Sequence, residues 1–119
     1  MNYRRGDIVI VDYPFGDASG SKIRPALVVQ ADSDNARMTN TIVAMITKNL
    51  SRVALEPTQF LIDIATPQGA LTGLKFNSAV NCNNLLTLHE RKLLRKIGRL
   101  SEDLLAKINA CLKTALSLN

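Results

Sequence analysis

The chain has 119 residues, 46% of them hydrophobic and 21% charged, a balance typical of one globular domain covering residues 1–119. The formal net charge of +5 and the sequence pI near 9.6 favour an anionic partner. The alternative is that the charge only keeps the protein soluble. The N-terminus lacks the apolar segment of a signal peptide, and no stretch approaches the roughly 20 apolar residues of a membrane span. We therefore expect a cytoplasmic protein with no membrane contact.

The first expected elements are short β-strands separated by polar turns. Residues 8–13 form a β-branched run, and residues 14–22 form a loop rich in turn formers and serine. The run that follows this loop is apolar again, so the first two strands are expected to pair antiparallel. The predicted strands cover residues 8–13, 25–30, 41–47, 59–64, 74–80 and 96–100.

Helices are expected late in the chain. Thr87 and Glu90 fit a capping box, which predicts a helical turn near residues 89–93. Ser101 precedes two acidic residues and begins a longer helix whose apolar positions recur at helical spacing. These apolar positions are Leu104, Ile108, Cys111, Leu112 and Ala115. The predicted fold class is therefore mainly β with a C-terminal helix (α+β), as a strongly bent sheet or half-open barrel.

Several kinds of chemistry lack the residues that they need. A mechanism with two imidazoles is excluded because His89 is the single histidine, and its place in a turn favours a structural role. Cys82 and Cys111 lie far apart in the sequence, so we expect buried, reduced thiols and no metal site. Asp32 and Asp34 lack the glycine and glutamate of a calcium loop, which favours a turn. We expect no cofactor.

Two residues remain as candidates for chemistry. Pro25 favours an extended backbone at Arg24, which fixes where a guanidinium suited to phosphate leaves the chain. Thr47 ends an apolar strand beside Lys48, where its hydroxyl could bond a phosphate oxygen. Taken alone, an Arg-Pro at the start of a strand is ordinarily a surface cation, and a threonine at the end of a strand is usually structural.

Together these segments resemble the MazF/PemK family of type II toxins. Residues 5–9 resemble the opening strand of that family, residues 19–29 its loop and Arg-Pro strand, and residues 42–47 its third strand with the terminal threonine. Residues 73–80 and the helix that follows Ser101 match the later pattern. The likeness covers nearly the whole chain in the right order.

The resemblance implies an SH3-like small β-barrel of the MazF/CcdB kind, usually a homodimer, that cleaves single-stranded mRNA without a metal. The ribose 2′-hydroxyl would attack the adjacent phosphate and leave a 2′,3′-cyclic phosphate and a 5′-hydroxyl. Arg24 and Thr47 match the catalytic positions. The resemblance further implies an acidic antitoxin as partner, with DNA binding only through that antitoxin.

Other residues are expected to bind the RNA. Lys22, Lys48 and Arg52 would follow the RNA backbone, together with Ser19 and Ser21 of the loop. Phe15 and Tyr13 are candidates for base stacking or for anchoring the loop.

The chain also departs from the family pattern. Asn83 stands where relatives often have an acidic residue, and Leu86 where they often have a cation. These departures keep open a non-catalytic nucleic-acid- or protein-binding barrel. A gyrase poison of the CcdB kind is the weaker alternative, because this chain has no tryptophan.

Overall fold

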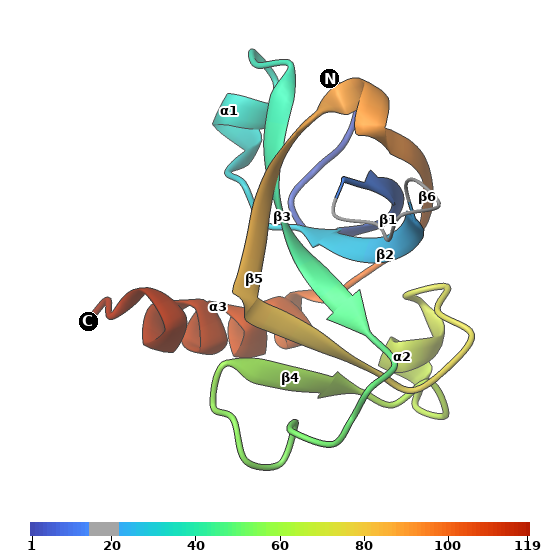
Figure 1. Ribbon diagram of the computed structural model, residues 1–119, viewed down its shortest axis with the longest axis vertical. Coiled ribbons are helices and arrows are strands. Elements are labelled where there is room, and N and C mark those ends of the chain that lie inside the picture. The colour runs from blue at the N-terminus through green and yellow to red at the C-terminus, as the bar shows by residue number, and fades with distance from the viewer. Residues whose placement is uncertain (15–21) are drawn as a thin grey trace.

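The computed structural model describes residues 1–14 and 22–119 (Figure 1). Within them the chain forms strands, three α-helices and a short 3-10 helix, η1 (Glu90–Lys92). The strands are β1 (Asp7–Tyr13), β2 (Lys22–Val28), β3 (Asn40–Thr47), β4 (Gln59–Ile62), β5 (Ser78–His89) and β6 (Leu93–Arg99). The α-helices are α1 (Asp32–Asn35), α2 (Pro67–Ala70) and α3 (Glu102–Leu116).

All strands belong to one antiparallel sheet in the order β4-β5-β3-β2-β1-β6. The sheet curls strongly on the side of β1, β2 and β6 (Figure 1). It stays open, because β4 and β6 are its two edges. The predicted mainly β fold with a terminal helix is confirmed, in its half-open rather than its closed form.

β5 is the long strand that joins both halves of the sheet, and it bends near its middle (Figure 1). Its register against β3 moves from Ala44 opposite Leu85 to Met45 opposite Asn81, so residues 82–84 form a bulge. Such a bulge bends a strand and re-aims its side chains. The sequence prediction of a strand at 74–80 was wrong at both ends, because pairing with β3 extends β5 as far as His89.

Other strand and helix boundaries also shift. β2 begins at Lys22 because residues 22–27 pair along β1, and β6 begins at Leu93 for the same reason. The expected capping box is wrong: Thr87 lies within β5, opposite Ile42. The turn is capped instead by His89, whose Nδ1 accepts from the Arg91 amide at 3.1 Å, which confirms a structural role for this imidazole.

The core has two parts, on the two faces of the curled sheet. The larger part lies between the sheet and α3, where Ile108 is fully buried and the rest of the predicted apolar stripe packs around it. α3 begins as predicted, with Ser101 Oγ accepting from the Leu104 amide at 3.3 Å. The smaller part includes Val11, Ala26 and Met45 and lies inside the curl of the sheet.

The two cysteines lie together in the larger core, and both are buried and free. Burial raises the pKa of the Cys82 thiol to about 12, and the neighbouring Cys111 adds to this shift. A thiol held in its neutral form is a poor nucleophile and metal ligand. The cysteines are therefore packing residues, as expected.

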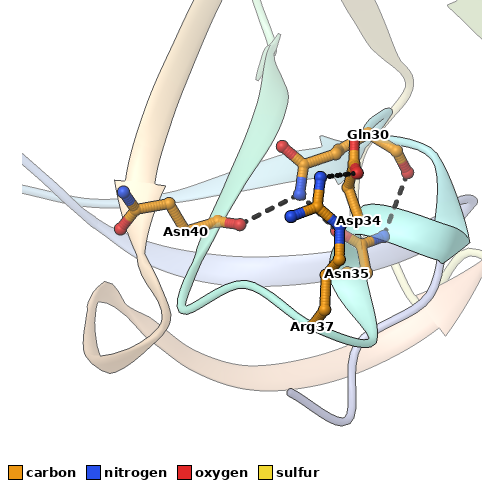
Figure 2. Close-up of polar contacts among 5 residues, drawn as sticks. All are labelled: Gln30, Asp34, Asn35, Arg37 and Asn40. Carbon is orange, nitrogen blue, oxygen red and sulfur yellow. Dashed lines mark hydrogen bonds and ion pairs between the residues drawn. The ribbon is translucent and has the colours of Figure 1, made fainter.

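A buried polar network fixes α1 against the start of β3 (Figure 2). Asn35, 1% exposed, donates from Nδ2 to the Gln30 carbonyl at 3.0 Å. Its Oδ1 accepts from Gln30 Nε2 at 2.9 Å and from Thr41 Oγ1 at 2.7 Å, and the Gln30 amide also donates to the Asn40 carbonyl at 2.9 Å. The segment with Asp32 and Asp34 is therefore a short helix, held by hydrogen bonds of the Gln30 and Asn35 side-chain amides. The sequence predicted a turn here.

Candidate nucleic-acid interface

Two adjoining cavities share Arg24 and Ile46 as part of their lining. The larger has a volume of about 330 Å³ and the smaller of about 200 Å³. We call the two together the cationic groove. Both sequence-predicted catalytic residues contribute to it.

Arg24 lies in β2 opposite Val11 of β1, one residue before Pro25, which is itself paired with Ile10. The strand conformation that Pro25 favours at Arg24 is therefore reinforced by the β1 ladder. Arg24 is partly buried. Among the described residues its guanidinium takes part in no ion pair or side-chain hydrogen bond, so its donors are available to a ligand.

Thr47 reaches the same place from β3. The pairing of β2 with β3 runs as far as Ala26 opposite Met45, and Arg24 and Thr47 each lie two residues beyond that pair. Both line the smaller cavity, with Tyr13 and Asn84. Thr47 Oγ1 accepts from the Asn49 amide at 3.0 Å and keeps its own hydrogen to donate.

The larger cavity is strongly cationic. Arg24, Lys48, Lys75 and Arg95 line it, and no carboxylate appears among its described lining residues. The ion pairs among the described residues involve other cations, for example Asp7 with Lys96 at 3.1 Å. Cations that are close together and unpaired attract a ligand with several negative charges, such as a nucleic-acid backbone.

A tight turn between α2 and β5 brings Lys75 and Phe76 to the groove. Gly73 has φ +73°, and a Cβ there would lie 2.0 Å from the Ile97 carbonyl oxygen, so this turn requires glycine. The turn is tied to β6 by the Arg99 amide, which donates to the Leu71 carbonyl at 3.0 Å. At its other end Ser78 Oγ donates to the Phe76 carbonyl at 2.8 Å.

The other predicted RNA-binding residues are placed differently. Lys48 lines the larger cavity, with its Nζ 4.8 Å from the centre of the Phe76 ring. Lys22 is exposed at the start of β2, and Arg52 pairs with Glu56 at 2.9 Å; neither lines the groove. Phe15, Ser19 and Ser21 lie outside the described residues.

Sequence reasoning missed the further cations and the aromatic ring of the larger cavity, which are Lys75, Arg95 and Phe76. Arg95 belongs to a basic stretch, and nothing in the sequence indicates which of its cations reaches the groove. In the structure Arg95 lines the larger cavity because it lies on the same face of β6 as Ile97. For Phe76, an aromatic residue beside a cation just after Gly73 was the available signal.

The departures from the family pattern fall around the β5 bulge. Asn83 donates from Nδ2 to Thr58 Oγ1 at 2.7 Å, and Leu86 packs against the smaller core. Asn83 thus ties the bulge to the segment before β4. From the bulge, Asn84 reaches the smaller cavity.

The described residues offer neither a metal site nor a membrane-spanning helix. In residues 1–14 and 22–119, no group of three or more His, Cys, Asp or Glu side chains is placed to hold a metal ion. No helix of this part of the chain is long and apolar enough to cross a membrane.

Comparisons with known proteins agree on one family. Residues 4–116 match the sequence profile described as "PemK-like, MazF-like toxin of type II toxin-antitoxin system". The chain is 33% identical to endoribonuclease MazF9 of Mycobacterium tuberculosis over 97% of both chains. It is 29% identical to endoribonuclease EndoA of Bacillus subtilis, over 99% of this chain and 97% of the relative.

A solved structure supports the fold independently. A mycobacterial endoribonuclease in complex with its cognate antitoxin superimposes with a TM-score of 0.77 at 23% identity. The match covers 98% of this chain and 97% of that chain.

Proposed function

The chain belongs to the PemK-like, MazF-like toxins of type II toxin-antitoxin systems, and we propose on that premise that it is a metal-independent endoribonuclease. Its substrate is single-stranded mRNA, which it cuts at a short sequence, and the loss of mRNA stops translation and growth. The names of its relatives, endoribonucleases MazF9 and EndoA, support this activity.

One observation of this chain carries the proposal most strongly. Arg24 and Thr47 come from different strands to one small cavity, and Arg24 also faces a larger cavity lined by further cations. A phosphate bound at Arg24 would thus have room for the RNA strand beside it.

The proposed reaction is an internal transfer at phosphorus. The ribose 2′-oxygen forms a bond to phosphorus and loses its proton, while the bond from phosphorus to the 5′-oxygen breaks and that oxygen gains a proton. Negative charge builds up on the non-bridging oxygens, where a fixed guanidinium stabilises it. Guanidinium groups stay protonated in proteins, so we assign charge stabilisation to Arg24 rather than proton abstraction.

Thr47 and the remaining cations have supporting roles. The Thr47 hydroxyl donates to a non-bridging oxygen while still accepting from the Asn49 amide. Lys48, at the wall of the larger cavity, binds the neighbouring phosphate. Lys22 and Arg52 attract the RNA backbone from outside the groove, and Ser19, Ser21 and Phe15 complete the contact from the loop.

The cellular setting follows from the same premise. We propose that the chain works in the cytoplasm as a homodimer, with an acidic antitoxin that covers the groove. The net charge of +5 favours such a partner. The mycobacterial neighbour seen with its cognate antitoxin supports this arrangement.

Incubation of the purified protein with a long single-stranded RNA in EDTA tests the function. We expect discrete fragments with 2′,3′-cyclic phosphate and 5′-hydroxyl ends. Intact RNA after incubation with a folded protein would contradict the proposal and favour a non-catalytic binding barrel.

A further inference from the structure

Phe76 presents an aromatic ring at the groove, and its surroundings hold that ring in place. The residue is 58% exposed although it is apolar. Its carbonyl accepts from Ser78 Oγ at 2.8 Å, and Ser78 is itself 2% exposed. On the next residue, Asn77 Oδ1 accepts from the Ile64 amide at 3.0 Å, so two hydrogen bonds anchor the chain directly after the ring.

The side chain is oriented as well. Lys48 Nζ lies 4.8 Å from the ring centre, a cation–π contact that favours one position of the ring over others. An exposed ring held by its backbone and by a cation loses little conformational entropy when a ligand stacks on it. The ring is therefore preorganised for binding.

The residues around the ring limit the kinds of ligand that can bind there. Phe76 shares its cavity with Lys75, Arg95 and the other two cations, with no carboxylate among the described lining residues. A ligand that suits this cavity carries a flat face for the ring and negative charge for the cations. An unpaired nucleotide has both, since every base has a π face and every link carries a phosphate.

We propose that Phe76 is the stacking platform for one unpaired base next to the scissile phosphate. This inference rests on the proposed function and adds the place of a flanking nucleotide. Arg24 lines both cavities, so a phosphate at Arg24 leaves the next nucleotide at the larger cavity. The base stacks on Phe76, and Lys75 and Arg95 bind the phosphate beyond it.

Phe76 is thus a positioning residue that contributes to RNA binding more than to the chemical step. Stacking on an aromatic ring tolerates all bases, so Phe76 adds affinity and placement rather than base identity. Its removal is expected to raise KM and leave kcat nearly unchanged.

A first experiment observes stacking without cleavage. The chain contains no tryptophan, so an F76W variant carries a single indole at the ring position. We expect its fluorescence to be quenched, to saturation, by a random-sequence single strand that is fully 2′-O-methylated and cannot be cut. Polyglutamate, which has negative charge and no bases, is expected to leave the emission unchanged.

Each opposite result overturns the platform. Constant emission while a fluorescein-labelled strand shows binding by anisotropy would place the bases elsewhere. Equal quenching by polyglutamate would show that negative charge without bases accounts for the change in emission. Absence of any binding of the methylated strand would also contradict it. None of these readouts needs cleavage, so they are separate from the test of the proposed function.

A second experiment uses cleavage of an RNA that the wild type cuts. Loss of one stacked base corresponds to about a ten-fold or greater change in affinity, so F76A should raise KM by about ten-fold. F76L, which keeps an apolar side chain without a π face, should be impaired, and F76W should recover the wild-type KM. L118A is the control, because Leu118 is 59% exposed, follows the C-terminal end of α3 and lines neither cavity of the groove.

A wild-type KM for F76A, or full recovery by F76L, would overturn the proposal. Wild-type protein that leaves RNA intact while the F76W variant is still quenched by the methylated strand would contradict the proposed cleavage and support the platform.

Discussion

The buried network around Asn35 and the cationic groove are both polar, yet they use their polar groups in opposite ways. In the network, Gln30 and Asn35 pair with each other within the protein (Figure 2). The Thr41 hydroxyl also donates to Asn35. In the groove, Arg24 has no ion pair or side-chain hydrogen bond among the described residues, and other cations surround it. Paired groups hold the fold, whereas unpaired groups at a cavity are available to a substrate.

The largest expected effect comes from Arg24→Ala. Loss of one fixed donor to the developing charge lowers kcat by about 10²- to 10³-fold. The free energy of unfolding should change little, because Arg24 holds no other side chain. Single-turnover cleavage of RNA in EDTA measures the rate, with Arg37→Ala as control for an arginine distant from the groove. Equal rates for wild type and Arg24→Ala would remove Arg24 from the chemistry.

Asn35→Ala should have the opposite profile. It leaves the Thr41 hydroxyl and the Gln30 carbonyl without their Asn35 partner, while Gln30 Nε2 keeps only its bond to the Asn40 carbonyl. The free energy of unfolding should fall by about 2–3 kcal/mol. Urea denaturation followed by circular dichroism measures this loss. Arg37→Ala is again the control, since it removes the exposed 2.7 Å pair with Asp34 beside the same network and should cost less than about 1 kcal/mol. Similar losses in both variants would show that the buried bonds contribute no more than a surface pair.

The two regions also differ in what the sequence could predict. Arg24, Thr47 and Lys48 were found because Pro25 and the end of an apolar strand mark their positions. Lys75, Phe76 and Arg95 come from a turn and an edge strand that meet only through tertiary packing, and no local pattern aligns them. The network around Asn35 could not be predicted from the sequence either, since Asn35 gains its partners only when α1 packs on β3.

The same limit explains the errors in the fold. Apolar runs located β1 and β3 well, because burial on both faces leaves a continuous hydrophobic stretch. β5 was misplaced because its second half has polar residues and a bulge, and only its pairing with β3 extends it. The helix α3 was predicted accurately, since its cap and its apolar stripe are both local features.

Thr47 combines the two kinds of role, because it lines the groove and its hydroxyl also accepts a structural hydrogen bond from the Asn49 amide. Thr47→Val should lower kcat by about ten-fold through the lost hydrogen bond to the phosphate, and Thr47→Ser should restore most of it. Asn49→Ala separates the two roles, since it removes only the 3.0 Å bond to the Ser51 amide in the same turn. An equal loss of kcat in Thr47→Val and Asn49→Ala would reduce Thr47 to a turn residue.

The smallest expected effect concerns Lys75, one of the two cations proposed to bind the phosphate beyond the stacked base. Lys75→Gln should weaken RNA binding uniformly across sequences and reduce the slope of log Kd against log salt by about 0.7, the value for one phosphate contact on a single strand. Binding of a 2′-O-methylated strand, measured by anisotropy between low and moderate salt, gives this slope. Lys107→Gln, on the exposed side of α3, should leave it unchanged. Equal slopes for both variants would show that Lys75 makes no phosphate contact.

The most direct test of the account measures two quantities on two variants. The cleavage rate and the free energy of unfolding are determined for both Arg24→Ala and Asn35→Ala. We expect Arg24→Ala to lose cleavage at nearly wild-type stability, and Asn35→Ala to lose stability while the folded fraction cuts RNA at nearly the wild-type rate. Loss of cleavage and stability together in both variants would contradict the division between a groove that acts on RNA and a network that holds the fold.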